Sequence, residues 1–272
     1  MIDLPIMHVG FAHSGTTSLQ ENVFSKRTDL FYAGVPYGDL GGIFSWVKYH
    51  EPRRYDTDAT TALVAELIFG RMQAGQRLVI SDETLVDQPA IYYTPAMMHV
   101  ALIAERLHAL FGPARVLFTL RNPLHTVVST YLVLKRNYTA LANRDIEPFE
   151  QWFAGNLTQE RNLFLRNLDP SLAIREYELV FGEGQVNVLP LELLTREGVG
   201  AYLCRLGEIT GLEFSPSEID GYVARNVSQK HDLLLTAEQR DIIHNRSAAG
   251  NAYVAQRFGL PLAQYGYPMA SS

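Results

Sequence analysis

The sequence predicts an α/β fold: a parallel central sheet of about five strands, flanked by helices, within 272 residues. The first observation is a series of five short runs that are apolar, β-branched or aromatic, as buried strands are. The second is helical periodicity in most of the segments between these runs. Strands that alternate with helices form parallel sheets with right-handed crossovers, and such sheets are covered on both faces.

The expected strands and helices follow one another along the whole chain. The strands are expected at Leu4–Val9, Leu30–Gly34, Arg77–Ile80, Arg115–Leu120 and Val186–Leu191. Helices are expected at Thr16–Ser25, Asp58–Met72 and Val100–Phe111, after Arg121, at Ser171–Phe181 and from Thr236 to about Phe258. Gly112 and Gly182 mark two helix ends, and Thr236 with Gln239 matches a capping box at a helix start.

Composition indicates a single folded domain over residues 1–272. Apolar residues make up 47% of the chain and charged residues 19%, which provides the apolar surface for a sizeable core. The net charge of −6 argues against a nucleic-acid partner, because phosphate contacts favour basic proteins. A phosphate site in this chain is therefore expected to be a local basic pocket.

The cysteine and hydropathy patterns bear on the location of the protein. Cys204 is the only cysteine, so no intrachain disulfide is expected, and no Cys/His cluster has the spacing of a zinc site. No apolar run approaches the length of about 20 residues that spans a bilayer. These patterns predict a cytoplasmic protein with no metal site and no membrane span.

Two stretches interrupt the alternation of strands and helices, at residues 35–57 and 137–170. Long insertions in folds of this kind usually lie over the ligand site, so both are expected to form lids or substrate-binding elements. Aromatic residues that are able to stack on an acceptor, or simply to pack, are Tyr37, Trp46, Tyr49, Tyr92 and Tyr93.

A glycine-rich turn follows the first predicted strand and opens the first predicted helix, at Gly10–Leu19 (GFAHSGTTSL). In this context a turn presents successive backbone N–H groups to a phosphate, and the helix dipole adds favourable potential. The side chains of Ser14, Thr16, Thr17 and Ser18 add hydroxyl groups to the same segment. A purely structural turn is the alternative interpretation.

Two other loop types fit this segment less well. In the P-loop pattern GxxxxGK[ST] the glycines match Gly10 and Gly15, but Thr16 takes the place of the lysine that ATPases need. A serine hydrolase elbow at Ser14 requires glycines two residues before and after it, where this chain has Ala12 and Thr16. Phosphate binding is therefore expected, whereas ATP hydrolysis and serine hydrolase chemistry are not.

A second motif, Arg121–Ser129 (RNPLHTVVS), follows the predicted strand Arg115–Leu120. Pro123 suits the first turn of a helix, which places Arg121 at the carboxyl end of a strand and Ser129 about two turns into the helix. Ligands bind at this edge of parallel sheets. An Arg–Ser pair there holds a phosphate through a charged fork and a hydroxyl, although Arg121 alone is equally compatible with a surface ion pair.

Together the two motifs resemble the family of sulfotransferases that use 3′-phosphoadenylyl sulfate (PAPS), and the bacterial carbohydrate and small-molecule branch in particular. Gly10–Leu19 is similar to the family's 5′-phosphosulfate-binding loop, and Arg121–Ser129 is similar to its 3′-phosphate-binding motif. Weaker likeness extends to Ser81–Thr84, Val188–Glu192 and Arg225–Ser228.

The resemblance implies a P-loop-like sulfotransferase fold and transfer of a sulfuryl group from PAPS to a hydroxyl or amine of a glycan or small metabolite. Adenosine 3′,5′-bisphosphate would be the product, and no metal is implied. The residues that would bind PAPS are Gly10, Ser14, Gly15, Thr16, Thr17 and Ser18 at the 5′ end, with Arg121, Ser129, Arg225 and Lys230 at the 3′-phosphate.

Two positions depart from the family's pattern. His13 stands where the family usually has Lys or Arg, the donor to the bridging oxygen as the sulfuryl group leaves, and His125 stands where Asp is common. A neutral imidazole donates one hydrogen bond and carries a charge only below its pKa, so activity is expected to depend on pH if His13 takes the catalytic role. Alternatively, His13 merely fills the site.

A general base is needed to take the acceptor's proton, and Glu83 is the first candidate. It follows the predicted strand Arg77–Ile80 and is expected to face the same cleft, with Asp82 and His50 as reserves. A structural carboxylate near a helix start is the alternative for Glu83.

Two rival functions are also compatible with the motifs. A small-molecule or nucleotide kinase on the same scaffold predicts Mg-ATP binding and a lysine in place of Thr16. A degenerate PAPS-binding protein, motivated by His13, predicts binding without turnover.

Overall fold

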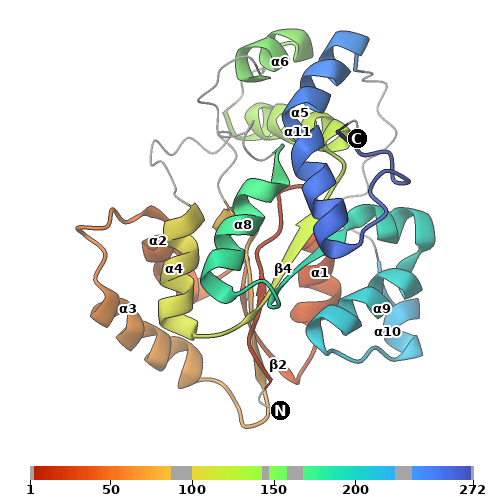
Figure 1. Ribbon diagram of the computed structural model, residues 1–272. Helices are drawn as coiled ribbons and strands as arrows, with labels where there is room; N and C mark the ends of the chain where they lie inside the picture. Colours follow the sequence, from red (N-terminus) through yellow and green to blue (C-terminus); the bar gives the residue numbers. More distant parts are fainter. Residues whose placement is uncertain (1–2, 87–99, 143–146, 158–167, 224–234, 271–272) are drawn as a thin grey trace.

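The structure is a computed structural model that describes residues 3–86, 100–142, 147–157, 168–223 and 235–270 (Figure 1). Its centre is a sheet of five strands in the order β2-β3-β1-β4-β5, and every neighbouring pair is parallel. The strands are β1 (Ile6–His8), β2 (Leu30–Gly34), β3 (Arg77–Ser81), β4 (Arg115–Leu120) and β5 (Val186–Pro190). The predicted fold class is confirmed.

The strand order places a topological switch point beside β1. From β1 the chain leads to β2 and β3 on one side of the sheet and later to β4 and β5 on the other. Ligands in open α/β sheets bind at such a point, outside the carboxyl ends of the strands. The turn that follows β1 therefore lies where this architecture is best suited to a ligand.

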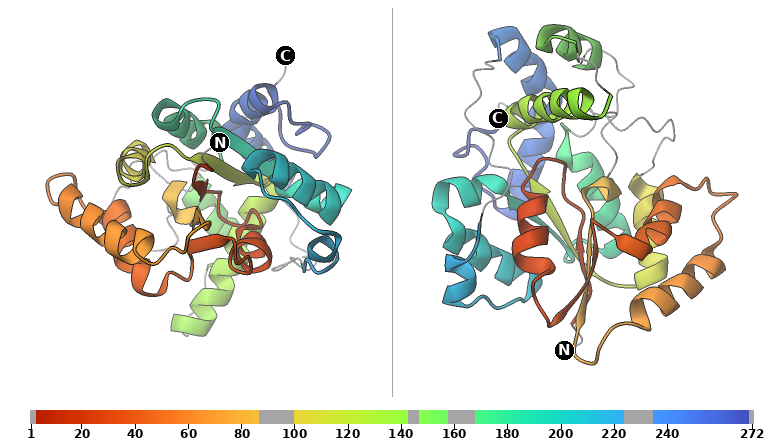
Figure 2. Two further views of the ribbon diagram at one scale, coloured as in Figure 1. Left: turned by 90° about the horizontal axis from the view of Figure 1, so that it is seen from below. Right: turned by 180° about the vertical axis from the view of Figure 1, so that it is seen from behind.

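Helices connect the strands and cover both faces of the sheet (Figure 2). They are α1 (Thr16–Leu19), η1 (Gln20–Phe24), η2 (Gly38–Leu40), α2 (Gly41–Tyr49), α3 (Thr57–Val64), η3 (Ala65–Phe69), η4 (Glu83–Val86), α4 (Val100–Phe111), α5 (Pro123–Ala142), α6 (Phe149–Leu157), α8 (Pro170–Phe181), η6 (Leu193–Glu197), α9 (Val199–Thr210), α10 (Pro216–Asp220) and α11 (Ala237–Phe258). The predicted helices are found, with α1 continued by η1 and α3 by η3. The capping box at Thr236 is present.

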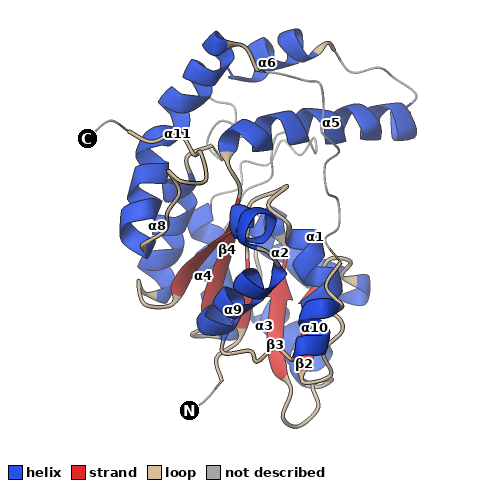
Figure 3. Ribbon diagram, turned by 90° about the vertical axis from the view of Figure 1, so that its right-hand side faces the viewer, coloured by secondary structure: helices blue, strands red, loops and turns tan. Residues whose placement is uncertain are grey.

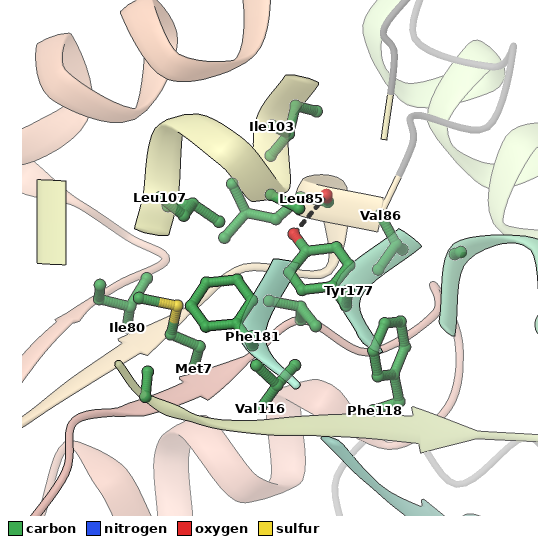
Figure 4. Packing of buried hydrophobic residues seen from close by; sticks show 14 of the residues in the cluster. Met7, Ile80, Leu85, Val86, Ile103, Leu107, Val116, Phe118, Tyr177 and Phe181 are labelled. Carbon is green, nitrogen blue, oxygen red and sulfur yellow. Dashed lines mark hydrogen bonds between the residues drawn. The ribbon is translucent and has the colours of Figure 1, made fainter. Parts of the chain in front are cut away.

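The apolar strands are explained by burial on both faces. Met7 and Ile80 contribute to a core cluster that α4 and α8 cover, in which Tyr177 donates a hydrogen bond to the Leu85 carbonyl over 3.0 Å (Figure 4). The neighbouring residues Ile6 and Val79 point to the other face, in a cluster covered by α1 and α9. Each such side chain contributes about 1.5–3 kcal/mol when it is removed from water.

A third layer of helices lies beyond the carboxyl edge of the sheet (Figure 3). It is built from α5, α6 and α11, whose buried residues include Val127, Tyr131, Leu134, Phe149, Trp152, Phe153 and Ile243. This cluster holds α5 across the edge at which β1 and β4 end. No described helix is both long and apolar enough to cross a membrane.

The two predicted insertions contain more regular structure than the sequence suggested. Residues 35–57 include α2, which joins the core through Ile43, Phe44 and Val47. The described parts of 137–170 are the end of α5, the helix α6 and the start of α8. Residues 143–146 and 158–167 lie outside the described residues, and a lid function for either insertion stays a prediction.

Candidate functional site

The turn between β1 and α1 is held against β4 so closely that only glycine fits at its first position. A Cβ atom on Gly10 would lie 1.7 Å from Oγ1 of Thr119. Gly15 adopts φ of +87°, and a Cβ there would meet Cδ1 of Leu191 at 2.7 Å. Both glycines are therefore required by the backbone path of the turn.

Buried polar side chains attach this turn to three strands. Ser14 donates to the Phe11 carbonyl and pairs with Oγ1 of Thr119 over 2.7 Å. Thr119 lies 3.3 Å from Nε2 of His8, whose Nδ1 lies 2.7 Å from Oγ of Ser81. The chain of contacts Ser14–Thr119–His8–Ser81 thus runs beneath the turn across β4, β1 and β3.

This network was not anticipated from the sequence. Burial lowers the pKa of His8 to about 3, with Asp82 opposing the shift, so His8 is neutral at pH 7. The hydroxyl of Ser14 was predicted to face phosphate, yet here it contacts the turn and the sheet. Thr16 and Ser18 are buried and Thr17 is half-buried at the start of α1. Phosphate contacts by these residues stay a prediction.

Arg121 brings the two motifs together. Its Nη1 donates to the carbonyl oxygen of His13 over 3.1 Å and to Oγ of Ser129 over 2.9 Å. His13 adopts φ of 64°, a left-handed conformation that is uncommon outside glycine, and thereby directs its carbonyl to Arg121. The Arg–Ser pair predicted from the sequence is present and touches the predicted phosphate turn.

Glu192 organises the surroundings of Arg121. It lies just beyond β5, is buried, and accepts hydrogen bonds from the Asn122 amide over 3.0 Å and from Tyr267 Oη over 2.6 Å. Burial lowers the pKa of Arg121, whereas Glu192 and Tyr267 raise it. The contribution of Tyr267 was missed, because the sequence near the C-terminus carries no motif that points to this site.

His125 also lies beside Glu192, with its Nδ1 at 4.0 Å from Oε1 of the carboxylate. Its pKa is lowered, chiefly by burial and then by the charge of Arg121, while Glu192 acts in the opposite direction. His125 is therefore neutral at pH 7. It occupies the first turn of α5, on the same helix as Ser129.

His13 has the environment of a neutral hydrogen-bonding group. Burial, joined by the charges of Arg121 and Arg136, lowers the pKa of its imidazole to about 4. Its Nε2 is buried and meets no hydrogen-bond partner in the described part of the chain. A buried polar atom without a partner is costly, so Nε2 is a candidate for contact with a ligand.

Glu83 begins the short helix η4 at the carboxyl end of β3. Burial raises the pKa of its carboxyl group, while Gln20 beside it acts in the opposite direction. Its Oε2 is buried and lacks a partner among the residues that the structure describes. A carboxylate with a raised pKa at a ligand edge is a candidate base.

Asp82, a reserve candidate for the base, is held by its neighbours. Lys48 contacts its Oδ2 at 2.8 Å, the Thr84 amide donates to its Oδ1 over 2.7 Å, and Tyr37 donates to its Oδ2. Asp82 is 1% exposed and the Lys48 side chain 8%, so this is a buried ion pair. Asp82 therefore has a structural partner, whereas Glu83 beside it has an unsatisfied oxygen.

Several predicted residues lie elsewhere or outside the described residues. His50 and Trp46 contact each other, with ring centroids 5.4 Å apart, and Tyr37 stacks on Phe44 at 4.5 Å. Arg225, Lys230, Tyr92 and Tyr93 fall outside the described residues. Within the described ranges, no group of three or more His, Cys, Asp or Glu residues is arranged to hold a metal ion.

Comparisons with known proteins place this geometry in a structural context. No protein-family model matches the chain, and no curated protein matches its sequence. Among solved structures, a sulfotransferase from Alicyclobacillus acidocaldarius matches with a TM-score of 0.59 and 17% identity, over 98% of this chain and 100% of that one. A sulfotransferase domain from the curacin biosynthetic pathway matches with a TM-score of 0.47 and 15% identity, over 98% and 99% of the two chains.

The match to the bacterial structure bears on the fold. It covers nearly all of both chains, so the likeness concerns the fold as a whole. The resemblance indicated by Gly10–Leu19 and Arg121–Ser129 is therefore confirmed for the fold. The chain has the α/β fold of a solved bacterial sulfotransferase.

Proposed function

We propose that the protein transfers a sulfuryl group from PAPS to a hydroxyl or amine of a glycan or small metabolite and releases adenosine 3′,5′-bisphosphate. One observation carries the proposal: Arg121 contacts both Ser129 and the backbone of His13 at the carboxyl edge of the sheet. The predicted 3′-phosphate and 5′-phosphosulfate motifs thus meet at one place. The fold shared with a bacterial sulfotransferase supports the same function.

The Arg–Ser pair is suited to a 3′-phosphate. Guanidinium and hydroxyl groups bind phosphate oxygens through charge-assisted and neutral hydrogen bonds, and the planar fork of arginine adds directional preference. Arg121 is half-buried, so its charge is less screened than that of a surface arginine. ATP lacks a 3′-phosphate, so this pair would select PAPS over ATP. Arg225 or Lys230 would complete the clamp.

The transfer itself is an in-line displacement. The acceptor oxygen or nitrogen attacks sulfur, the bond between sulfur and the bridging oxygen breaks, and the electron pair of that bond leaves with adenosine 3′,5′-bisphosphate. Backbone N–H groups of Gly15 to Thr17 would hold the 5′ end, whereas that of Ser14, also predicted to do so, donates to the Phe11 carbonyl over 3.3 Å. Nε2 of His13 would donate to the bridging oxygen. Such positioned donors stabilise charge that develops in the transition state.

Glu83 would accept the proton that the acceptor loses. Its raised pKa makes its carboxylate a stronger base, and its buried Oε2 has no partner in the described part of the chain. The neighbouring Asp82 is held by Lys48 and Thr84, which favours Glu83 for the role. A cytoplasmic location and a single domain are compatible with this activity and stay predictions.

The proposal is tested by calorimetric titration with adenosine 3′,5′-bisphosphate and, in parallel, with ATP, both without added metal. We expect a Kd for the bisphosphate in the range of about 1–100 μM, or roughly 5–8 kcal/mol of binding free energy. ATP is expected to bind much more weakly. In a further titration with Mg²⁺ added, tight binding of ATP by a protein that does not bind the bisphosphate would favour the kinase. In a screen of acceptors, binding of PAPS without turnover would favour a degenerate binding protein.

A further inference from the structure

The helix α5 has two functionally different faces. Val127, Tyr131 and Leu134 are buried in the cluster shared with α6 and α11. Ser129 lies on the opposite face, where its hydroxyl accepts from Arg121. Figure 3 shows that α5 runs across the carboxyl edge of the sheet, so its second face is directed to the candidate site.

Arg136 shares the face of Ser129. Seven residues separate the two positions, which is close to two full turns, and they differ by about 20° around the helix axis and about 10 Å along it. Arg136 is exposed, so its guanidinium is accessible to a ligand. Its neighbour Lys135 is rotated by about 100° around the same helix and belongs to a different face.

Helix α5 begins just after β4 and crosses the same edge of the sheet as the turn that carries His13 (Figure 3). The electrostatics agree with this path: burial lowers the pKa of His13 first, and the charges of Arg121 and Arg136 act in the same direction. Nε2 of His13 is buried without a partner among the described residues. No motif in the sequence points to Arg136, because the path of α5 over the sheet edge decides which residues it brings to His13.

We infer that Arg136 binds the sulfuryl oxygens of PAPS and supplies the positive charge that Lys or Arg usually supplies from position 13 in the family that the motifs resemble. This inference rests on the proposed function. His13 and Arg136 would together replace one cationic residue. The imidazole would donate a single hydrogen bond to the bridging oxygen, and the guanidinium would neutralise negative charge on the sulfuryl group.

The chemistry of the transfer explains why such a charge is useful. As the bond from the acceptor to sulfur forms and the bond from sulfur to the bridging oxygen breaks, negative charge is spread over the sulfuryl oxygens and the leaving bisphosphate. The proton of the acceptor passes to Glu83. A planar guanidinium contacts two oxygens at once, which a single neutral imidazole cannot do.

The position of Arg136 is tested without any ligand. The pKa of His13 is measured by NMR titration in the wild type, in Arg136→Ala and in the matched control Lys135→Ala. Removal of a nearby positive charge favours protonation, so Arg136→Ala is expected to raise the pKa of His13 while Lys135→Ala leaves it unchanged. An unchanged pKa in Arg136→Ala would overturn the inference whatever the protein binds.

The role of Arg136 is tested with two ligands that differ in the sulfuryl group. Arg136→Ala is expected to weaken the binding of PAPS roughly tenfold and that of adenosine 3′,5′-bisphosphate by less than about threefold. Arg136→Lys is expected to bind PAPS with an affinity between those of the wild type and Arg136→Ala. Equal weakening of both ligands, or of neither, contradicts a contact with the sulfuryl group. Failure of the wild type to bind the bisphosphate is a different outcome: it rejects the proposed function, and the role of Arg136 with it.

Discussion

Nη1 of Arg121 and Oγ of Ser129 lie 2.9 Å apart, across the junction between β4 and α5. The arginine directly follows β4, and the serine stands eight residues later on the helix that crosses the sheet edge. Because the same nitrogen also donates to the carbonyl of His13, the pair fixes the spacing between the two halves of the candidate site.

Ser129→Ala is expected to weaken the binding of adenosine 3′,5′-bisphosphate roughly tenfold. The variant lacks the hydroxyl that would contact the 3′-phosphate and that accepts a hydrogen bond from Arg121. Calorimetric titration measures the change. Ser45→Ala, at an exposed position of α2, is the matched control and is expected to bind as the wild type does. Equal affinity in both variants would remove Ser129 from the phosphate site.

Replacement of His13 tests its part in leaving-group chemistry. His13→Ala is expected to lower turnover of PAPS, whereas His13→Lys is expected to keep or raise it. In the free protein the pKa of His13 is about 4, so the imidazole is neutral from pH 6 to pH 8 and the pH dependence due to His13 is expected at acid pH. Turnover is measured as a function of pH for all three proteins. Unchanged turnover in His13→Ala would exclude a catalytic role for His13.

Glu83→Gln tests whether Glu83, and not the neighbouring Asp82, is the general base. The variant keeps the size and polarity of the side chain, so it is expected to bind the bisphosphate normally and to lose turnover by about 10²–10⁴-fold. In the wild type the acid limb of the pH profile is expected above the usual range of a glutamate, because burial raises the pKa of Glu83.

Asp82→Asn is expected to behave differently. It leaves Lys48 buried without its carboxylate and should lower the free energy of unfolding by about 3–5 kcal/mol. Chemical denaturation of both variants measures this difference. If Asp82→Asn is stable and inactive while Glu83→Gln is active, the assignment of the two carboxylates is reversed.

His8 is expected to make the fold sensitive to acid. Its pKa is about 3 in the folded protein, against 6.5 for a solvated histidine such as the unfolded chain presents. Between these values the unfolded chain binds more protons than the folded protein, so stability is present above the upper value and is lost as the pH falls.

We expect His8→Gln to reduce this acid dependence, as measured by the midpoint of thermal unfolding at pH 7.5 and pH 5. The variant retains groups for hydrogen bonds to Ser81 and Thr119, which limits its cost at pH 7.5. The same loss of stability on acidification in wild type and variant would show that another group governs it.

The strands were the easiest part of the structure to predict. Ile6 and Met7 enter different core clusters, so a strand buried on both faces reads as a continuous apolar run. Helix α2 was missed because Gly41, Gly42 and the mixed polarity around Lys48 obscure its apolar face. Tertiary packing of Phe44 decides its conformation.

The sequence located those parts of the candidate site that carry local motifs, and their role in binding stays a prediction. Arg121, Ser129 and the turn with Gly10 carry patterns that are local in the sequence. The pairing of His8 with Ser81 joins residues 73 positions apart, and it depends on the register between β1 and β3. The face that Arg136 shares with Ser129 is likewise brought to the sheet edge only by the path of α5. Such contacts follow from the assembled fold and leave no local pattern.

The most direct test of the central claim compares two ligands in two proteins: adenosine 3′,5′-bisphosphate and adenosine 5′-monophosphate, titrated into the wild type and Arg121→Ala. If Arg121 binds the 3′-phosphate, the alanine variant loses roughly 10- to 100-fold in affinity for the bisphosphate and little for the monophosphate. Equal losses for the two ligands, or no preference of the wild type for the bisphosphate, would contradict the account.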